Sequence, residues 1–99
     1  MDVNFWGPSL WNALHTITFD YPETPTQLEK IQYKNFFESL KHVLPCGSCR
    51  KHFAKAIDEQ FPIDAALKDR NTFTRWLVDF HNSVNKRLGK PEVTYDSVK

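Results

Sequence analysis

Prolines divide the sequence into four stretches, and each stretch repeats its apolar residues at helical spacing. The breaks fall at Pro22, Pro45, Pro62 and Pro91, where the ring removes the backbone N–H that a continuing helix needs. The chain has only three glycines, and no segment alternates apolar and polar residues as a half-buried strand does. We therefore expect an all-α four-helix bundle with short loops.

The first two helices have recognisable ends. We expect the first to start near Pro8, which suits a first helical turn, and to end before Tyr21. The second is expected to follow Thr26, which forms a capping-box pattern with Glu29, and to run to about Leu44. The residues expected to face inward from it are Leu28, Ile31, Phe36, Leu40, Val43 and Leu44.

A third helix is expected directly after Pro45, ending at 61–62, with a short turn over 63–67. Asn71 or Thr72 is expected to cap a fourth helix, which Gly89 ends. Residues 94–99 offer at most one further turn.

Size and charge exclude several classes of protein. Ninety-nine residues suffice for one domain, so residues 1–99 are expected to form a single domain. Thirteen Lys and Arg against twelve Asp and Glu give a net charge of +1, which argues against a nucleic-acid partner. No apolar run approaches the roughly 20 residues of a membrane span, and no signal peptide is visible, so we expect a soluble, complete chain.

The two cysteines, Cys46 and Cys49, form a C-x-x-C pair at the expected start of the third helix. One such pair rules out a disulfide-stapled miniprotein and indicates redox or metal chemistry. The positive end of the helix dipole stabilises a thiolate, and Arg50 and Lys51 add positive charge nearby. We expect Cys46 to be the exchanging sulfur and Cys49 to face the core.

Several interpretations of the pair compete. A zinc site could add His52, although no second ligand pair has zinc-finger spacing, and no metal ligand is assigned. A thioredoxin-like fold also uses C-G-x-C but needs a βαβ setting that is missing here. A flavin-free dithiol interaction module, a helical structural subunit and two inert core cysteines remain possible. The last alternative is a dithiol that passes electrons to an organic cofactor inside the bundle.

Aromatic and polar side chains favour that cofactor. Trp11 and His15 lie one turn apart, and His81 and Asn85 share a helix face. Along the fourth helix, apolar residues give way to hydrogen-bonding and then to cationic ones. That order matches a ligand with a flat ring at one end and phosphates at the other.

Three motifs together resemble the Erv/ALR-type FAD-linked sulfhydryl oxidases. They are Trp6-Gly7-Pro8-Ser9-Leu10-Trp11 with His15, then Pro45-Cys46-x-x-Cys49-x-x-His52-Phe53, then His81-Asn82-x-Val84-Asn85-Lys86-Arg87-Leu88-Gly89-Lys90-Pro91. The resemblance implies a four-helix bundle with a short fifth C-terminal helix, FAD at the bundle mouth and a homodimer packed through the first two helices.

The resemblance also implies roles for individual residues. Cys46 would exchange with the substrate, and Cys49 would contact the flavin. The other cofactor contacts it implies are Trp6, Gly7, Trp11, His15, His52, Phe53, His81, Asn82, Val84 and Asn85, with Lys86, Arg87 or Lys90 near the pyrophosphate. The reaction would oxidise protein dithiols to disulfides and pass the electrons through FAD to O2, giving H2O2.

Two features differ from the family's cellular members. Tyr95 stands where those members have a cysteine, so Tyr95 is expected to stack on the flavin instead. A second C-x-x-C is absent, which leaves a protein dithiol or a thioredoxin-like relay protein as the electron donor. The sequence is in these respects similar to the short versions of large DNA viruses. It is expected in the host cytoplasm or virion if viral, and otherwise in the mitochondrial intermembrane space or the secretory lumen.

Overall fold

The computed structural model describes residues 2–99, which form helices and helical turns and contain no β-strand. The α-helices are α1 (Val3–Phe19), α2 (Gln27–Val43), α3 (Gly47–Lys55) and α4 (Arg70–Leu88). A π-helical turn, η1 (Ala56–Gln60), extends α3, and 3-10 turns form η2 (Asp64–Lys68) and η3 (Asp96–Val98). The expected four-helix bundle is confirmed, and in the place of the expected short fifth C-terminal helix there is a single 3-10 turn, η3.

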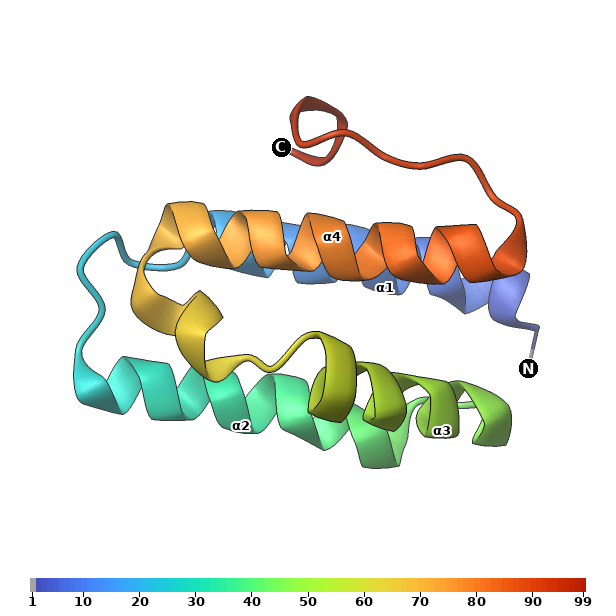
Figure 1. Ribbon diagram of the computed structural model, residues 1–99, viewed down its shortest axis with the longest axis horizontal. Helices are drawn as coiled ribbons and strands as arrows, with labels where there is room; N and C mark the ends of the chain where they lie inside the picture. Colours follow the sequence, from blue (N-terminus) through green and yellow to red (C-terminus); the bar gives the residue numbers. More distant parts are fainter. Residues whose placement is uncertain (1) are drawn as a thin grey trace.

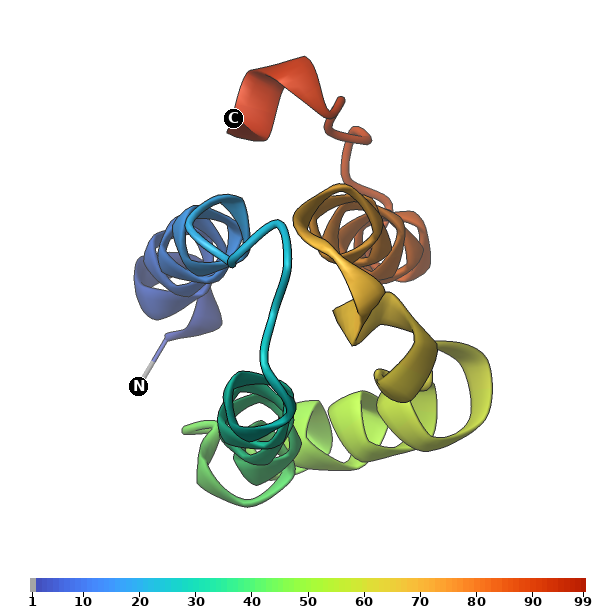
Figure 2. The ribbon, with the colours of Figure 1, turned by 90° about the vertical axis from the view of Figure 1, so that its left-hand side faces the viewer.

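The helices lie in two layers. Figure 1 shows α1 and α4 side by side in one layer, with α2 and α3 in the other. Viewed from the end, the C-terminal segment passes over α1 and α4 on the side away from α2 (Figure 2). No helix within residues 2–99 is both long and apolar enough to cross a membrane.

α1 begins earlier than its proline predicts. Asp2 caps the helix, and its carboxylate accepts the Asn4 N–H at 2.9 Å. Pro8 therefore lies inside the helix, where its ring is exposed to solvent. The prediction of a start near Pro8 was wrong because a side-chain cap four residues upstream of Trp6 satisfies the first turn.

The capping box that begins α2 is confirmed, but most of the inward-facing residues predicted for this helix are not. Thr26 Oγ1 accepts the Glu29 N–H, and Glu29 Oε1 accepts the Thr26 N–H. Leu40 and Leu44 are buried as predicted. Leu28, Ile31, Phe36 and Val43 are instead exposed, and Phe37 takes the central buried position. The buried stripe is narrow because only α3 and η2 pack closely on α2.

The start of α4 also differs from the prediction, while its end agrees. Asp69 is the N-cap, and its carboxylate accepts the Thr72 N–H at 2.8 Å, so neither Asn71 nor Thr72 has that role. Gly89 ends the helix at φ +70°, a left-handed conformation that glycine adopts at little cost.

Aromatic side chains fill the core at one end of the bundle. Tyr21, Phe37, Phe73 and Phe80 are almost completely buried, and Trp76 packs among them with mainly edge-to-face geometry. Tyr21 also donates its hydroxyl to the Leu67 carbonyl at 2.7 Å. We call this cluster the aromatic core. It packs α1, α2 and α4 together at this end of the bundle.

The C-terminal segment is fixed at two points. The Asn82 amide donates to the Val93 carbonyl at 2.8 Å and accepts the Val93 N–H at 2.7 Å. Further on, the Tyr95 ring packs against Phe19, and the Arg75 guanidinium lies 4.2 Å from its centroid. Residues 90–98 therefore follow a defined path.

Candidate functional site

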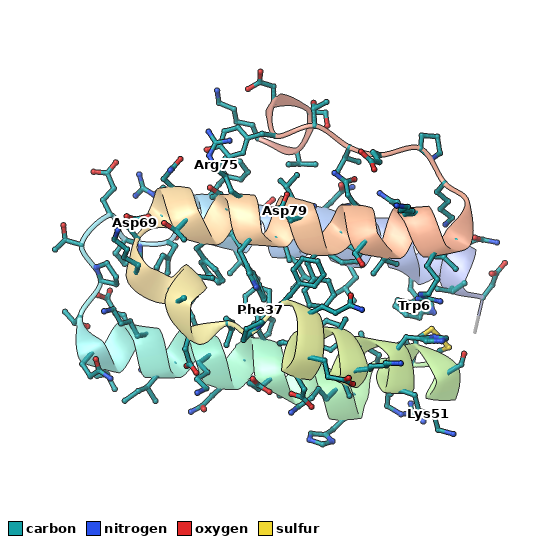
Figure 3. The ribbon with its side chains drawn as sticks, viewed as in Figure 1. Trp6, Phe37, Lys51, Asp69, Arg75 and Asp79 are labelled. Atoms are coloured by element: carbon teal, nitrogen blue, oxygen red, sulfur yellow. A yellow bond between two sulfur atoms is a disulfide. The ribbon has the colours of Figure 1, made fainter. Side chains whose placement is uncertain are left out.

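The two cysteines form a disulfide at the start of α3, with their Cα atoms 5.1 Å apart. Cys46 is the N-cap of α3, as the sequence predicts, and its Sγ accepts the Cys49 N–H at 3.2 Å. The chain takes this path because Pro45 prevents α2 from continuing, while Cys46 adopts an extended conformation that starts a new helix. Figure 3 shows the disulfide beside Trp6 at one end of the bundle.

Beside the disulfide, a cleft of about 690 Å³ opens between the two layers. Its walls include both cysteines together with residues from every α-helix. Besides the cysteines, the lining residues include Trp6, Gly7, Trp11, Ser48, His52, Phe53, Lys55, His81, Val84, Asn85, Arg87 and Lys90. The cleft therefore lies at the opposite end from the aromatic core, where the bundle is not filled by its own side chains.

Two stacked rings, Trp11 and His81, form one wall of the cleft, and a third ring, His15, lies behind them. Trp11 lies parallel to His81, with ring centroids 4.0 Å apart, and His81 Nδ1 lies 2.8 Å from His15 Nε2. His15 is buried behind them. The arrangement that leaves no buried N–H without an acceptor has His15 Nε2 donating to His81 Nδ1, which puts the remaining proton of His81 on Nε2.

Both imidazoles are held neutral. Burial lowers the pKa of His15 from its ordinary value of 6.5 to about 4. Burial also lowers the pKa of His81 to about 4, and the charges of His15 and Lys90 act in the same direction. The wall is therefore uncharged at neutral pH.

Two buried polar atoms on this side, the Trp6 indole N–H and His15 Nδ1, have no partner within the described residues. The Trp6 indole N–H is buried and makes no hydrogen bond, although Trp6 lines the cleft. A buried donor without an acceptor is destabilising unless a ligand or water supplies one. The Trp6 N–H points to a polar ligand group at this wall.

Positive side chains surround the rest of the cleft. Lys55, Arg87 and Lys90 all line it, and none forms an ion pair within residues 2–99. Asn85 adds a buried amide. Such a set can bind a phosphate-bearing molecule through charge-assisted hydrogen bonds.

The structure brings together most of the residues predicted for the site. The cysteines, Trp6, Gly7, Trp11, His52, Phe53, His81, Val84, Asn85, Arg87 and Lys90 all line one cleft.

Four predicted residues lie outside it. His15 acts behind His81, and Asn82 bonds the C-terminal segment. Lys86 is exposed and does not line the cleft. Tyr95 packs on Phe19, so the predicted stacking on a flavin in the cleft has no support in this arrangement. The segment that carries Tyr95 runs back along α1 and α4 because Asn82 bonds Val93.

Among the lining residues that sequence reasoning missed, Ser48 and Lys55 are polar. The signal for Lys55 is its position three residues after His52, on the same face of α3. Ser48 lies between the two cysteines, and its contact with Cys46 could not be predicted from spacing alone.

Comparison with known families identifies this arrangement. A family model described as the Erv1 / Alr family matches residues 8–99. The chain belongs to the Erv1 / Alr family. The motifs that suggested the resemblance are thus those of a true member, and most of their predicted site residues line the cleft of this Erv1 / Alr chain.

Relatives of this Erv1 / Alr chain come from viruses and from cellular organisms. A "Probable FAD-linked sulfhydryl oxidase R368" of Acanthamoeba polyphaga mimivirus is 38% identical over 95 residues, covering 96% of this chain and 66% of that protein. The "Mitochondrial FAD-linked sulfhydryl oxidase ERV1" of Saccharomyces cerevisiae is 38% identical over 91 residues, covering 92% of this chain and 47% of that protein. The chain thus spans about two thirds of the first relative and about half of the second.

A solved structure agrees with the fold. The FAD-binding domain of Erv1 from Saccharomyces cerevisiae superposes with a TM-score of 0.89 at 37% identity, covering 99% of this chain and 90% of that one.

Proposed function

We propose that this chain is an FAD-dependent thiol oxidase that makes disulfides in protein dithiols through Cys46 and Cys49. The observation that carries the proposal is the disulfide at the start of α3, which opens onto a cleft walled by indole and imidazole rings. The relatives named as FAD-linked sulfhydryl oxidases support it.

The cleft fits the cofactor. Its volume of about 690 Å³ is within the range of small-molecule and cofactor sites. The unpartnered Trp6 N–H requires a polar ligand atom, and the flat faces of Trp6 and Trp11 suit fused rings. Lys55, Arg87 and Lys90 carry the charge that a pyrophosphate needs.

The residues that would hold FAD divide by chemistry. Cys49, Trp6 and Phe53 would border the redox-active ring, and His81 and Asn85 would bind the adenine and ribose end. His15 would keep the His81 ring in place from behind. When bound, FAD supplies a two-electron acceptor that restores the cysteine disulfide and passes the electrons to O2, giving H2O2.

The chain's own sulfur atoms carry out the exchange with substrate. A substrate thiolate attacks Cys46 Sγ, the bond between the cysteines breaks, and Cys49 keeps the electron pair as a thiolate. A second substrate thiolate then attacks the substrate sulfur of this mixed disulfide, and Cys46 leaves as a thiolate. The substrate has lost two electrons and the cysteine pair has gained them.

The test combines a visible absorption spectrum with a rate of oxygen consumption. We expect the purified chain to show the visible absorption of a flavin and to consume oxygen when a dithiol is added. A colourless protein that holds one equivalent of zinc would favour a zinc-binding module and overturn the proposal.

Replacing Cys49 distinguishes flavin binding from thiol oxidation. We expect Cys49→Ser to retain flavin and to lose thiol-dependent oxygen uptake by at least 100-fold, a size typical of losing a catalytic nucleophile. In the same variant Cys46 has no disulfide partner, so it would form a mixed disulfide only when its thiolate attacks the disulfide of an oxidised substrate, which releases the other substrate sulfur as a thiolate. Oxidase activity at the unmodified level would contradict the assignment of Cys49.

We also propose a homodimer that packs through α1 and α2. Leu28, Phe36 and Val43 are spaced by eight and seven residues and leave an apolar stripe exposed on α2. Sedimentation of the unmodified chain should give a dimer, and Phe36→Glu should give a monomer with unchanged helicity. A monomer for both would remove this part of the proposal.

The electron donor is proposed to be a protein dithiol or a thioredoxin-like relay protein, because the chain carries no second C-x-x-C. A viral source would place the enzyme in the host cytoplasm or the virion. A cellular source would place it in the mitochondrial intermembrane space or the secretory lumen.

A further inference from the structure

Ser48 lies between the two cysteines, and the exchange described above gives it no role. Its Oγ lies 3.3 Å from Cys46 Sγ. Because Cys46 Sγ is bonded to Cys49 Sγ, it carries no proton, so the Ser48 hydroxyl must be the donor. Cys46 Sγ accepts the Cys49 N–H as well, so two donors converge on one sulfur.

The two sulfurs therefore differ in their surroundings. Within residues 2–99, no hydrogen bond reaches Cys49 Sγ, whereas Cys46 Sγ has two and caps the positive end of α3. Hydrogen bonds to an anion are roughly twice as strong as those between neutral groups. Both donors consequently favour the thiolate of Cys46 more than its disulfide or its thiol.

The nearby cations do not replace the hydroxyl. The Arg50 guanidinium donates to the Leu44 carbonyl at 2.6 Å, and Lys51 extends outward from α3 (Figure 3). The Ser48 hydroxyl is the one side-chain donor within the described residues that hydrogen-bonds to this sulfur.

We propose that Ser48 is a catalytic residue, which stabilises the Cys46 thiolate as it leaves the mixed disulfide. This inference rests on the proposed function. In that step the second substrate thiolate forms a bond to the substrate sulfur, and the bond to Cys46 Sγ breaks with its electron pair on Cys46. A better stabilised thiolate leaves faster, so the hydroxyl directs the mixed disulfide toward released product.

The first test titrates Cys46 alone. In the flavin-loaded Cys49→Ala chain, Cys46 is the sole cysteine, and its rate of alkylation by iodoacetamide is followed against pH. Adding Ser48→Ala should slow alkylation roughly fivefold near pH 6, the effect of one lost hydrogen bond, and the rates should meet at high pH. Ser48→Thr should restore the original profile.

Ser39→Ala serves as the control, because the Ser39 hydroxyl bonds the Phe36 carbonyl on α2, and Ser39 does not line the cleft. Its alkylation profile should be unchanged. Superimposable profiles for Ser48→Ala and its parent would overturn the inference.

The second test uses the intact cysteine pair and a dithiol peptide. Ser48→Ala should lower turnover several-fold with flavin absorption unchanged, and more mixed disulfide should be trapped by rapid acid quench. If the unmodified chain consumes no oxygen with any dithiol, the proposed function fails, and the catalytic assignment of Ser48 fails with it. If the chain is an oxidase but Ser48→Ala leaves alkylation and trapping unchanged, only the inference fails.

Discussion

At the scale of single residues, the site depends on side chains that are far apart in the sequence and meet only in the folded chain. His15 and His81 are 66 positions apart, yet their ring nitrogens lie 2.8 Å apart in the interior. Each imidazole is kept neutral because burial penalises its charged form. The hydrogen-bonded pair therefore supports the cleft wall and also makes the stability of the folded chain depend on pH.

The pair predicts how stability changes with pH. Unfolded histidines take up protons below about pH 6.5, whereas in the folded chain the pKa of each is lowered to about 4. The stabilising contribution is full above pH 6.5 and is lost as the pH falls toward 4. At about 1.4 kcal/mol per unit of pKa, reduced for coupling and partial solvent access, we expect a loss of about 2 kcal/mol.

Urea denaturation of the flavin-free chain at pH 7 and pH 5 measures this loss. His15→Gln removes one titrating ring and should reduce the difference between the two pH values by about half. His42→Gln changes an exposed histidine on α2 and should leave the difference as it is. An equal pH dependence for His15→Gln and the unmodified chain would contradict the explanation.

At the scale of elements, helix ends decide where the site lies. Cys46 starts α3 because Pro45 stops α2, and Gly89 ends α4 so that Lys90 turns toward the cleft. Asn82 then connects α4 to the segment that follows it. An amide on the outer side of α4 thus fixes the path of the last ten residues.

Asn82→Ala should release that segment. Both bonds to Val93 are lost, and at about 1 kcal/mol for each we expect amide exchange at Val93 to rise roughly tenfold to hundredfold. Hydrogen exchange measured at single residues checks this. Asn35→Ala, at an exposed position on α2, should not alter exchange at Val93. Unchanged protection in Asn82→Ala would show that Tyr95 alone holds the segment.

At the scale of the whole molecule, the bundle has a packed end and a hollow end. The aromatic core is almost closed to solvent, while the cleft leaves about 690 Å³ beside the disulfide. A ligand that fills the cleft should therefore stabilise the folded chain by mass action.

Thermal unfolding of the flavin-free chain, measured with and without added FAD, tests this stabilisation. We expect FAD at 100 times its Kd to raise the free energy of unfolding by about 2.7 kcal/mol, which corresponds to roughly 10 °C or more in Tm. FMN lacks the adenine end and should stabilise less, because His81 and Asn85 would make no contact with it. Equal Tm values with and without FAD would argue against flavin in this cleft.

Much of this organisation could be predicted from the sequence, for physical reasons. Pro45 and Gly89 marked helix ends, and the position of the cysteines directly after Pro45 predicted that the pair lies at a helix start. The inward face of α2 was mispredicted, because Leu28, Phe36 and Val43 have helical spacing but lie where no other helix packs. The position of Tyr95 depends on bonds from Asn82 that no periodicity encodes.

The separation of a filled end from a hollow one has a practical consequence for protein engineering. Because the aromatic core does not line the cleft, the exposed side chains beside Cys46 can be varied in a library while Leu14, Leu40 and Leu44, which line the cleft and belong to the hydrophobic core, are kept. A scaffold built in this way could acquire new substrate preferences while keeping its fold.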